Sequence, residues 1–211
     1  MTNREMKKPD HKLVFLGAAF VAFYVLANIL ATKKIGVGGL VLTGGLLCFP
    51  ITFLITDIVN EVYGKFTAQK FVYYGFTIMA LAVGIIHLAI YLPAASFWTE
   101  QQKAFAMILG GTFRITMGSM VAFLISQSHD IWAFNFWKNV TKGKHLWIRN
   151  NLSTVSSQII DSVIFITVAF WGIVPPEAIL PMITGQWAVK WAIAALDTPL
   201  CYIGVAWAKR D

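Results

Sequence analysis

Four polar side chains recur at helical spacing inside an apolar stretch of the sequence. Asn150, Thr154, Gln158 and Asp161 follow one another at steps of four, four and three residues. This spacing places all four on one face of a helix. Amide, hydroxyl and carboxyl groups bind a polar ligand through hydrogen bonds, and in a membrane such a stripe must face protein or water. The pattern therefore predicts a polar surface inside a helical bundle.

A second apolar stretch carries Asp57, Asn60 and Glu61 at positions i, i+3 and i+4. These positions share one helix face. An ionised side chain in the hydrocarbon core of a bilayer is costly, so such residues are candidates for function. Asn60 and Glu61 have an alternative placement at the level of the lipid headgroups, whereas Asp57 lies a full turn deeper.

A third stretch repeats the pattern with Gln186, Lys190 and Asp197, again close to one face. Lys190 and Asp197 are about 10 Å apart along a helix, so they cannot pair with each other. Their partners are expected on other helices, with Asp57 and Asp161 as the candidates.

Two interpretations of these polar faces remain open. They could hold a small polar ligand, with Phe53 and Trp187 stacking on it if it is flat. They could instead join helix to helix, with Lys190 or Arg149 neutralising an aspartate. The segment from residue 113 to 136 adds Ser119, Ser126 and Asp130. Several helices with polar faces exceed what packing requires, which favours the ligand.

Other chemistries lack their motifs. The sequence has no phosphate-binding loop, no metal motif and no Ser-His or Cys-His arrangement at helical spacing. Cys48 and Cys201 lie in apolar segments without paired spacing, so we interpret them as small hydrophobic residues. We expect no enzyme activity, no cofactor and no metal. The net charge of +7 comes from Lys and Arg residues between apolar runs, not from a basic face, so we expect no nucleic-acid partner.

The composition sets the elements that must position these residues. Of the 211 residues, 57% are hydrophobic and 13% are charged, which is typical of a protein in lipid. A membrane helix needs roughly 20 apolar residues, so six helices use nearly the whole chain. We predict an all-α membrane protein with one domain over residues 1–211. The expected spans are 13–31, 44–62, 71–92, 113–136, 146–172 and 177–208.

The loops predict the orientation. Most of the 17 Lys and Arg residues fall on the side of the two termini in a six-span arrangement, including Arg4, Lys7 and Lys8 at the start and Arg210 at the end. Cytoplasmic loops are enriched in Lys and Arg, so both termini are predicted to be cytoplasmic. The first apolar stretch is too long for a signal peptide and is followed by no cleavage site. A glycine-rich turn is expected at residues 36–39, and the loop after Pro93 could carry a short surface helix.

Several segments resemble the queuosine precursor transporter family, also called the vitamin uptake transporter family. They are FPITFLITDIVNEVYGK from Phe49 to Lys65, RITMGSMVAFLISQSHD from Arg114 to Asp130, LWIRNNLSTVSSQIIDSVIF from Leu146 to Phe165, Lys190, and the Leu-Asp-Thr-Pro stretch that ends at Pro199. The resemblance covers the second, fourth, fifth and sixth expected spans. The first and third spans match only in being hydrophobic.

The resemblance implies a multi-pass importer in the bacterial inner membrane. Its substrate would be a 7-deazaguanine-type base, in the cyano or aminomethyl form or as queuine, for salvage into a modified tRNA base. It also implies six helices similar to the substrate-binding subunits of energy-coupling-factor transporters. The alternative is a capture subunit for another vitamin-like molecule that needs a separate ATPase module. A homodimer, an ATPase module and membrane lipid are further candidate partners.

Overall fold

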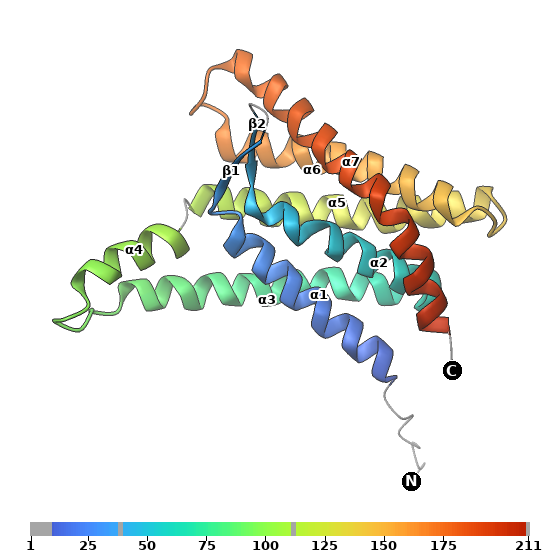
Figure 1. Ribbon diagram of the computed structural model, residues 1–211, viewed down its shortest axis with the longest axis horizontal. Helices are drawn as coiled ribbons and strands as arrows, with labels where there is room; N and C mark the ends of the chain where they lie inside the picture. The colour runs from blue at the N-terminus through green and yellow to red at the C-terminus, as the bar shows by residue number, and fades with distance from the viewer. Residues whose placement is uncertain (1–9, 38–39, 111–112, 210–211) are drawn as a thin grey trace, which may run out of the picture.

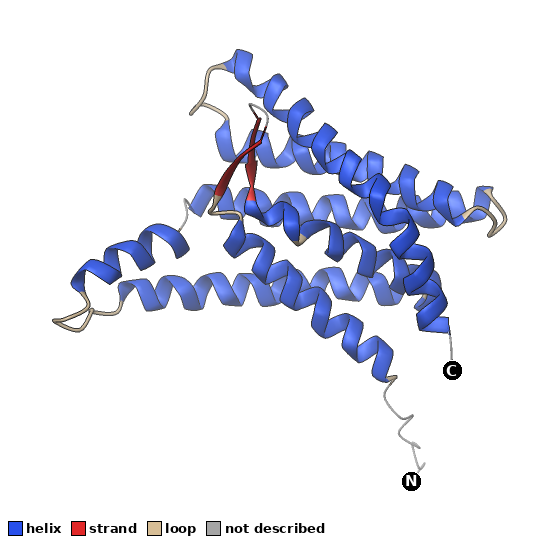
Figure 2. Cartoon of the chain, viewed as in Figure 1, coloured by secondary structure: helices blue, strands red, loops and turns tan. Residues whose placement is uncertain are grey.

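The computed structural model describes residues 10–37, 40–110 and 113–209. Helices make up nearly all of these residues, and a short antiparallel hairpin is the exception (Figures 1 and 2). In chain order the elements are α1 (His11–Leu30), β1 (Lys34–Val37), β2 (Leu40–Thr43), the 3₁₀ helix η1 (Gly44–Leu47), α2 (Phe49–Tyr63), α3 (Lys65–Tyr91), α4 (Thr99–Leu109), α5 (Phe113–Val140), α6 (Leu146–Phe170) and α7 (Pro176–Lys209).

The prediction of an all-α membrane protein is confirmed. Six helices, α1 to α3 and α5 to α7, overlap the six expected spans, and residues 44–47 of the second expected span form η1. By length and hydropathy, four segments among the described residues could cross a bilayer: His11–Leu30, Gly44–Tyr63, Lys65–Tyr91 and Leu146–Phe170. A fifth is α7, if its two bent halves form one span. Its 28 residues make α5 long enough as well, but its buried side includes the polar residues Ser126, Gln127 and Asp130.

Two expectations about loops have clear outcomes. The segment after Pro93 does carry a short helix, α4, which begins at Thr99. The chain reverses within the region expected to form a turn, residues 36–39, because β1 and β2 form an antiparallel hairpin in which Ile35 pairs with Leu42. Ile35 and Val37 before the glycines and Val41 after them have high strand propensity, which favours the strand pairing. Residues 38–39 lie outside the described part of the chain.

Close contacts fix the start of α2 against the end of α1. Gly44 and Gly45 lie so near α1 that a Cβ atom on Gly45 would come within 2.7 Å of the Ala27 carbonyl oxygen. Pro50 stands in the first turn of α2, where its missing N–H costs no helical hydrogen bond. The two glycines and Pro50 therefore determine where α2 begins relative to α1.

A bend of 47° separates Pro176–Ile193 from Asp197–Lys209 in α7. Pro199 lies inside this helix. A proline has no N–H for the carbonyl four residues earlier, and its ring clashes with that carbonyl. The bend therefore falls where Pro199 requires it, and it places Asp197 at the start of the second half.

The start of α1 and the end of α7 lie at the same end of the bundle, which we call the terminal end (Figure 1). There Lys12 Nζ of α1 donates to the Trp207 carbonyl oxygen of α7 over 3.2 Å, and Phe15 makes an edge contact with Trp207. The opposite end carries the β hairpin, and we call it the hairpin end. The basic residues Arg4, Lys7, Lys8 and Arg210 lie outside the described residues.

Large apolar side chains cover the outside of α1 and α3. Examples with more than half of their surface exposed are Val14, Phe15, Leu81, Ile85 and Leu88. An apolar exterior on long helices is suited to lipid. The interior, by contrast, holds many buried polar residues from α2, α5 and α6. This inside-out distribution of polarity is what a membrane bundle with a polar cavity requires.

Candidate functional site

The polar stripe of α6 faces a cavity between α2, α6 and α7, which we call the polar pocket. All four predicted stripe residues line it, and they meet Asp57, Lys190 and Asp197 there. Its space is about 520 Å³ when the open solvent at its mouth is included. The full lining is Leu46, Phe49, Pro50, Phe53, Leu54, Asp57, Asn150, Thr154, Gln158, Asp161, Lys190, Ile193 and Asp197.

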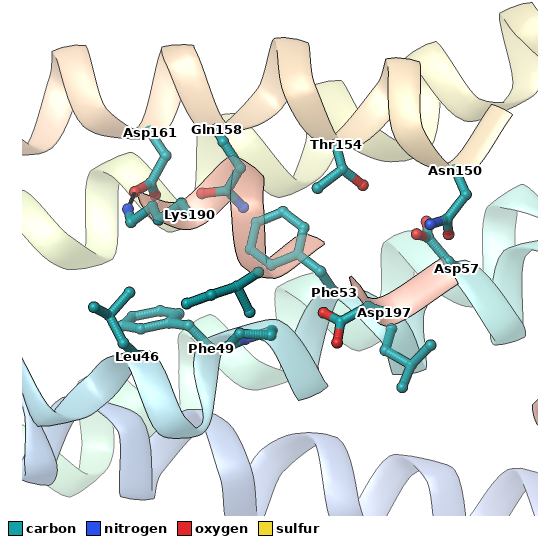
Figure 3. Close-up of a pocket in the computed structure, with 13 residues that line it drawn as sticks. Leu46, Phe49, Phe53, Asp57, Asn150, Thr154, Gln158, Asp161, Lys190 and Asp197 are labelled. Atoms are coloured by element: carbon teal, nitrogen blue, oxygen red, sulfur yellow. Dashed lines mark hydrogen bonds and ion pairs between the residues drawn. The ribbon is translucent and has the colours of Figure 1, made fainter. Parts of the chain in front are cut away.

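The charged groups are separated along this pocket. Asp161 and Lys190 lie at one end, and Asn150 and Asp57 lie at the other, with Phe53 between them (Figure 3). On α6, Asn150 and Asp161 are eleven residues apart, or roughly 16 Å along the helix. The pocket is thus long enough to offer different chemistry at its two ends.

An ion pair closes one end of the polar pocket. Lys190 of α7 pairs with Asp161 of α6, as the sequence suggested for one of the two aspartates. Both side chains are nearly enclosed, at 12% and 13% exposure. Ser126 of α5 adds a hydrogen bond to the Asp161 carboxylate over 3.2 Å. Each charge at this end is therefore compensated.

The other end carries acceptors that have no donor. Asp57 is 2% exposed and Asn150 is 3% exposed. Oδ1 of each is buried and lacks a hydrogen-bond partner among the described residues. Buried polar atoms without partners are uncommon in folded proteins and call for an explanation. A ligand that donates N–H or O–H groups would supply these partners.

Asn60 and Glu61 lie outside the polar pocket. The Asn60 side chain is enclosed between α2 and α5, where Asn135 Nδ2 donates to its Oδ1 over 2.7 Å. Glu61 binds three cations at the terminal end: Lys138 at 2.9 Å, Arg149 at 3.0 Å and Lys209 at 3.8 Å. These two side chains therefore join α2 to α5, α6 and α7.

Gln186 lines a second cavity, which we call the hairpin-side pocket, whereas Trp187 lines neither cavity. The Trp187 indole Nε1 donates to the Val155 carbonyl oxygen over 3.4 Å. The hairpin-side pocket has about 1310 Å³ of space when the open solvent at its mouth is included, and it is bordered by Thr32 and Thr43 at the two ends of the hairpin. It is mostly apolar, and His87 is among its few titratable side chains.

The two pockets share one wall. Leu46, Phe49, Asp161 and Lys190 line both of them. The ion pair and the Phe49 ring therefore stand between a cavity on the hairpin side and a cavity that extends toward the terminal end. Sequence spacing shows which residues share a helix face but cannot show that two cavities meet at one ion pair.

Two buried residues, Arg149 and Asp130, make contacts between helices that were not predicted from the sequence. Arg149 is 1% exposed, and its partner is Glu61 rather than an aspartate. Asp130 of α5 is fully enclosed, and Ser157 Oγ of α6 donates to its Oδ1 over 2.9 Å. The position of Asp130 in an apolar stretch of the sequence was the signal that could have identified it as a site residue. Among the described residues, no group of three or more His, Cys, Asp or Glu side chains is placed to hold a metal ion.

Comparisons with known proteins place the chain among membrane transporters. The sequence profile of a family described as "Putative vitamin uptake transporter" matches residues 43–204. A "Probable queuosine precursor transporter" of Bacillus subtilis is 33% identical over 180 residues, covering 84% of this chain and 78% of the relative. A protein of the same description from Haemophilus influenzae is 26% identical over 148 residues, covering 69% and 57%. No solved structure matches significantly.

Proposed function

The chain belongs to the vitamin uptake transporter family, and we propose that it imports a queuosine precursor, a base of the 7-deazaguanine type, through the polar pocket. It is a multi-pass protein of the bacterial inner membrane. The two relatives described as queuosine precursor transporters support the substrate class. The observation that carries the proposal is the pair of unpartnered acceptors opposite an aromatic wall.

The chemistry of the pocket fits a guanine-like edge. Such an edge presents adjacent N–H donors, and one carboxylate can accept two of them together. Asp57 Oδ1 is buried without a donor among the described residues, and Asn150 Oδ1 is a second acceptor without one, so the two together can accept such a pair of N–H groups. Phe49 and Phe53 supply rings on which a flat heterocycle can stack. The aminomethyl form would add a cation, which the half-buried Asp197 could attract.

The two pockets suggest a route. The base would enter the hairpin-side pocket, pass the shared wall and reach the polar pocket. Phe49 and the Asp161–Lys190 pair would have to move aside, since they line both cavities. Holding a substrate near mid-membrane while one gate opens at a time is the usual arrangement in secondary transporters.

The positions of the basic residues predict how the protein is oriented in the membrane. Lys12, Lys138, Arg149 and Lys209 lie near the terminal end, and cytoplasmic ends of membrane proteins are rich in such residues. We therefore place the terminal end in the cytoplasm. Reporter fusions after Lys209 and after Pro93 test this orientation. Cytoplasmic activity at the first position and periplasmic activity at the second are expected, and the reverse pattern would refute it.

An uptake assay tests the substrate. Cells that cannot synthesise the precursor are given the cyano or aminomethyl base, and queuosine in their tRNA is measured with and without this protein. Incorporation that depends on the protein is expected. We expect Asp57→Asn and Asp161→Asn to abolish it while the protein still inserts, and Glu177→Gln at an exposed position to leave it unchanged. Incorporation of neither base would sink the substrate assignment.

Purified protein in liposomes separates a complete transporter from a capture subunit. If the chain transports alone, labelled base accumulates inside vesicles that contain nothing else. If the chain is a capture subunit, it binds the base but moves none of it until an ATPase module is added. Binding without transport would therefore replace the first interpretation with the second.

A further inference from the structure

Two carboxyl groups from different helices meet behind the polar pocket. Asp57 of α2 lines the pocket, and Asp130 of α5 lies deeper, at 2% and 0% exposure. Their carboxyl groups lie within hydrogen-bonding contact of each other. The protein has packed an acidic residue against the proposed substrate acceptor, where a neutral residue would avoid repulsion.

This contact requires a proton. Ionised carboxylates only accept hydrogen bonds, so two of them cannot bond unless one carries hydrogen. Two negative charges at contact distance in a protein interior also repel strongly. Oδ1 of Asp57 and Oδ2 of Asp130 are both buried without a donor among the described residues. One proton between the two groups would satisfy the contact and leave a single negative charge.

The charged neighbours do not replace that proton. On α7 the pair faces Asp197 and Cys201, and Arg149 of α6, which also acts on Cys201, binds Glu61 of α2. From α1 the buried titratable group is Tyr24, whose acidic neighbour is Asp161. The buried residues of α3 are apolar or glycine. The surroundings are thus acidic on balance, which favours retention of one proton.

We propose that Asp57 and Asp130 form a proton-sharing pair, and that the proton passes from Asp57 to Asp130 when N–H groups of a substrate bind Asp57. The hydroxyl of Ser157 already donates to Asp130, so the empty site holds the proton on Asp57. On binding, the O–H bond of Asp57 breaks and one forms on Asp130, along their existing hydrogen bond. This second half of the proposal rests on the proposed function, whereas the shared proton itself does not.

Infrared spectroscopy tests the shared proton without any substrate. Purified protein in lipid at neutral pH is expected to show the carbonyl stretch of one buried protonated carboxyl group. Asp130→Asn and Asp57→Asn should each remove that band, because an amide N–H then donates to the remaining carboxylate. Glu177→Gln removes an exposed carboxyl group and should leave the band. Absence of the band in the wild-type protein, or its survival in both aspartate variants, would overturn the pair.

Binding of the cyano base to the same variants tests the transfer. Asp130→Asn keeps a charged Asp57 and a donor beside it, so it should bind the base as tightly as the wild-type protein. Asp57→Asn removes the charge and replaces one acceptor oxygen with an N–H donor, so it should weaken binding about tenfold or more. Asp130→Ala removes the donor as well and should bind less well than Asp130→Asn. Equal loss in Asp130→Asn and Asp57→Asn would refute the transfer, whereas a wild-type protein that binds no base would refute the substrate and leave the infrared result standing.

Discussion

Removal of the Lys190 charge should destabilise the protein, and removal of both charges of its ion pair should restore most of the loss. In Lys190→Gln the Asp161 carboxylate remains in a nearly enclosed site without its cation. In the double variant Asp161→Asn, Lys190→Gln, two neutral amides occupy the same space and can bond to each other. The single variant therefore keeps an uncompensated charge at Asp161, and the double variant has no charge at either position.

The size of the effect follows from burial. Lys190 and Asp161 are 12% and 13% exposed, and removal of one partner of a buried ion pair costs about 3–5 kcal/mol. The lower limit applies, because the polar pocket opens to water and Ser126 still donates to Asp161. We therefore expect a loss of about 3 kcal/mol for the single variant, roughly a hundredfold in the unfolding constant.

Unfolding in mixed detergent and dodecyl sulfate micelles, followed by circular dichroism, measures these differences. Lys33→Gln provides the control, because Lys33 is an exposed lysine near the hairpin, and it should change stability by less than about 0.5 kcal/mol. The double variant should lie within about 1 kcal/mol of the wild-type protein. A double variant as unstable as Lys190→Gln would refute the reasoning, since the loss would then come from packing and not from an uncompensated charge.

Two further predictions concern the same bundle. Glu61→Gln should lower the free energy of unfolding by about 3 kcal/mol, because it leaves the buried Arg149 without its counter-charge. Lys209→Gln should lower it by less than about 1 kcal/mol, because Lys209 is 57% exposed. Thermal unfolding in detergent compares the two variants, and equal losses would contradict this account of the ion cluster. Gly45→Ala should cost about 1–3 kcal/mol, because its Cβ would lie 2.7 Å from a backbone oxygen of α1. Gly84→Ala meets nothing within 4 Å and should be neutral or stabilising by up to about 1 kcal/mol, so a Gly45→Ala protein as stable as Gly84→Ala would argue against close packing at α2.

The sequence determined the helices and one face of the site. Membrane helices satisfy their own backbone hydrogen bonds, so apolar runs of sufficient length identify them without knowledge of the neighbours. The stripe from Asn150 to Asp161 was predictable for a similar reason, because a helical period of 3.6 residues follows from local geometry. The family resemblance was likewise visible in the segment from Phe49 to Lys65.

The same periodicity placed Asn60 and Glu61 too close to the candidate site. They share a general direction with Asp57, but a helix face is wide enough to contact several neighbours. The packing of α5 and α7 around α2 directs Asp57 to the pocket, Asn60 to α5 and Glu61 to the cluster of cations. Helix periodicity carries no information about which neighbour covers which part of the face.

Contacts between helices distant in the sequence were decided by tertiary structure alone. Sequence named Asp57 and Asp161 as equal candidates to bind Lys190, and the fold paired Lys190 with Asp161 and set Asp57 against Asp130. The polar residues of each helix and their order along it are thus fixed by sequence. Which charges are compensated depends on how the helices pack, because an ion pair or a shared proton requires two side chains to meet within a few ångströms.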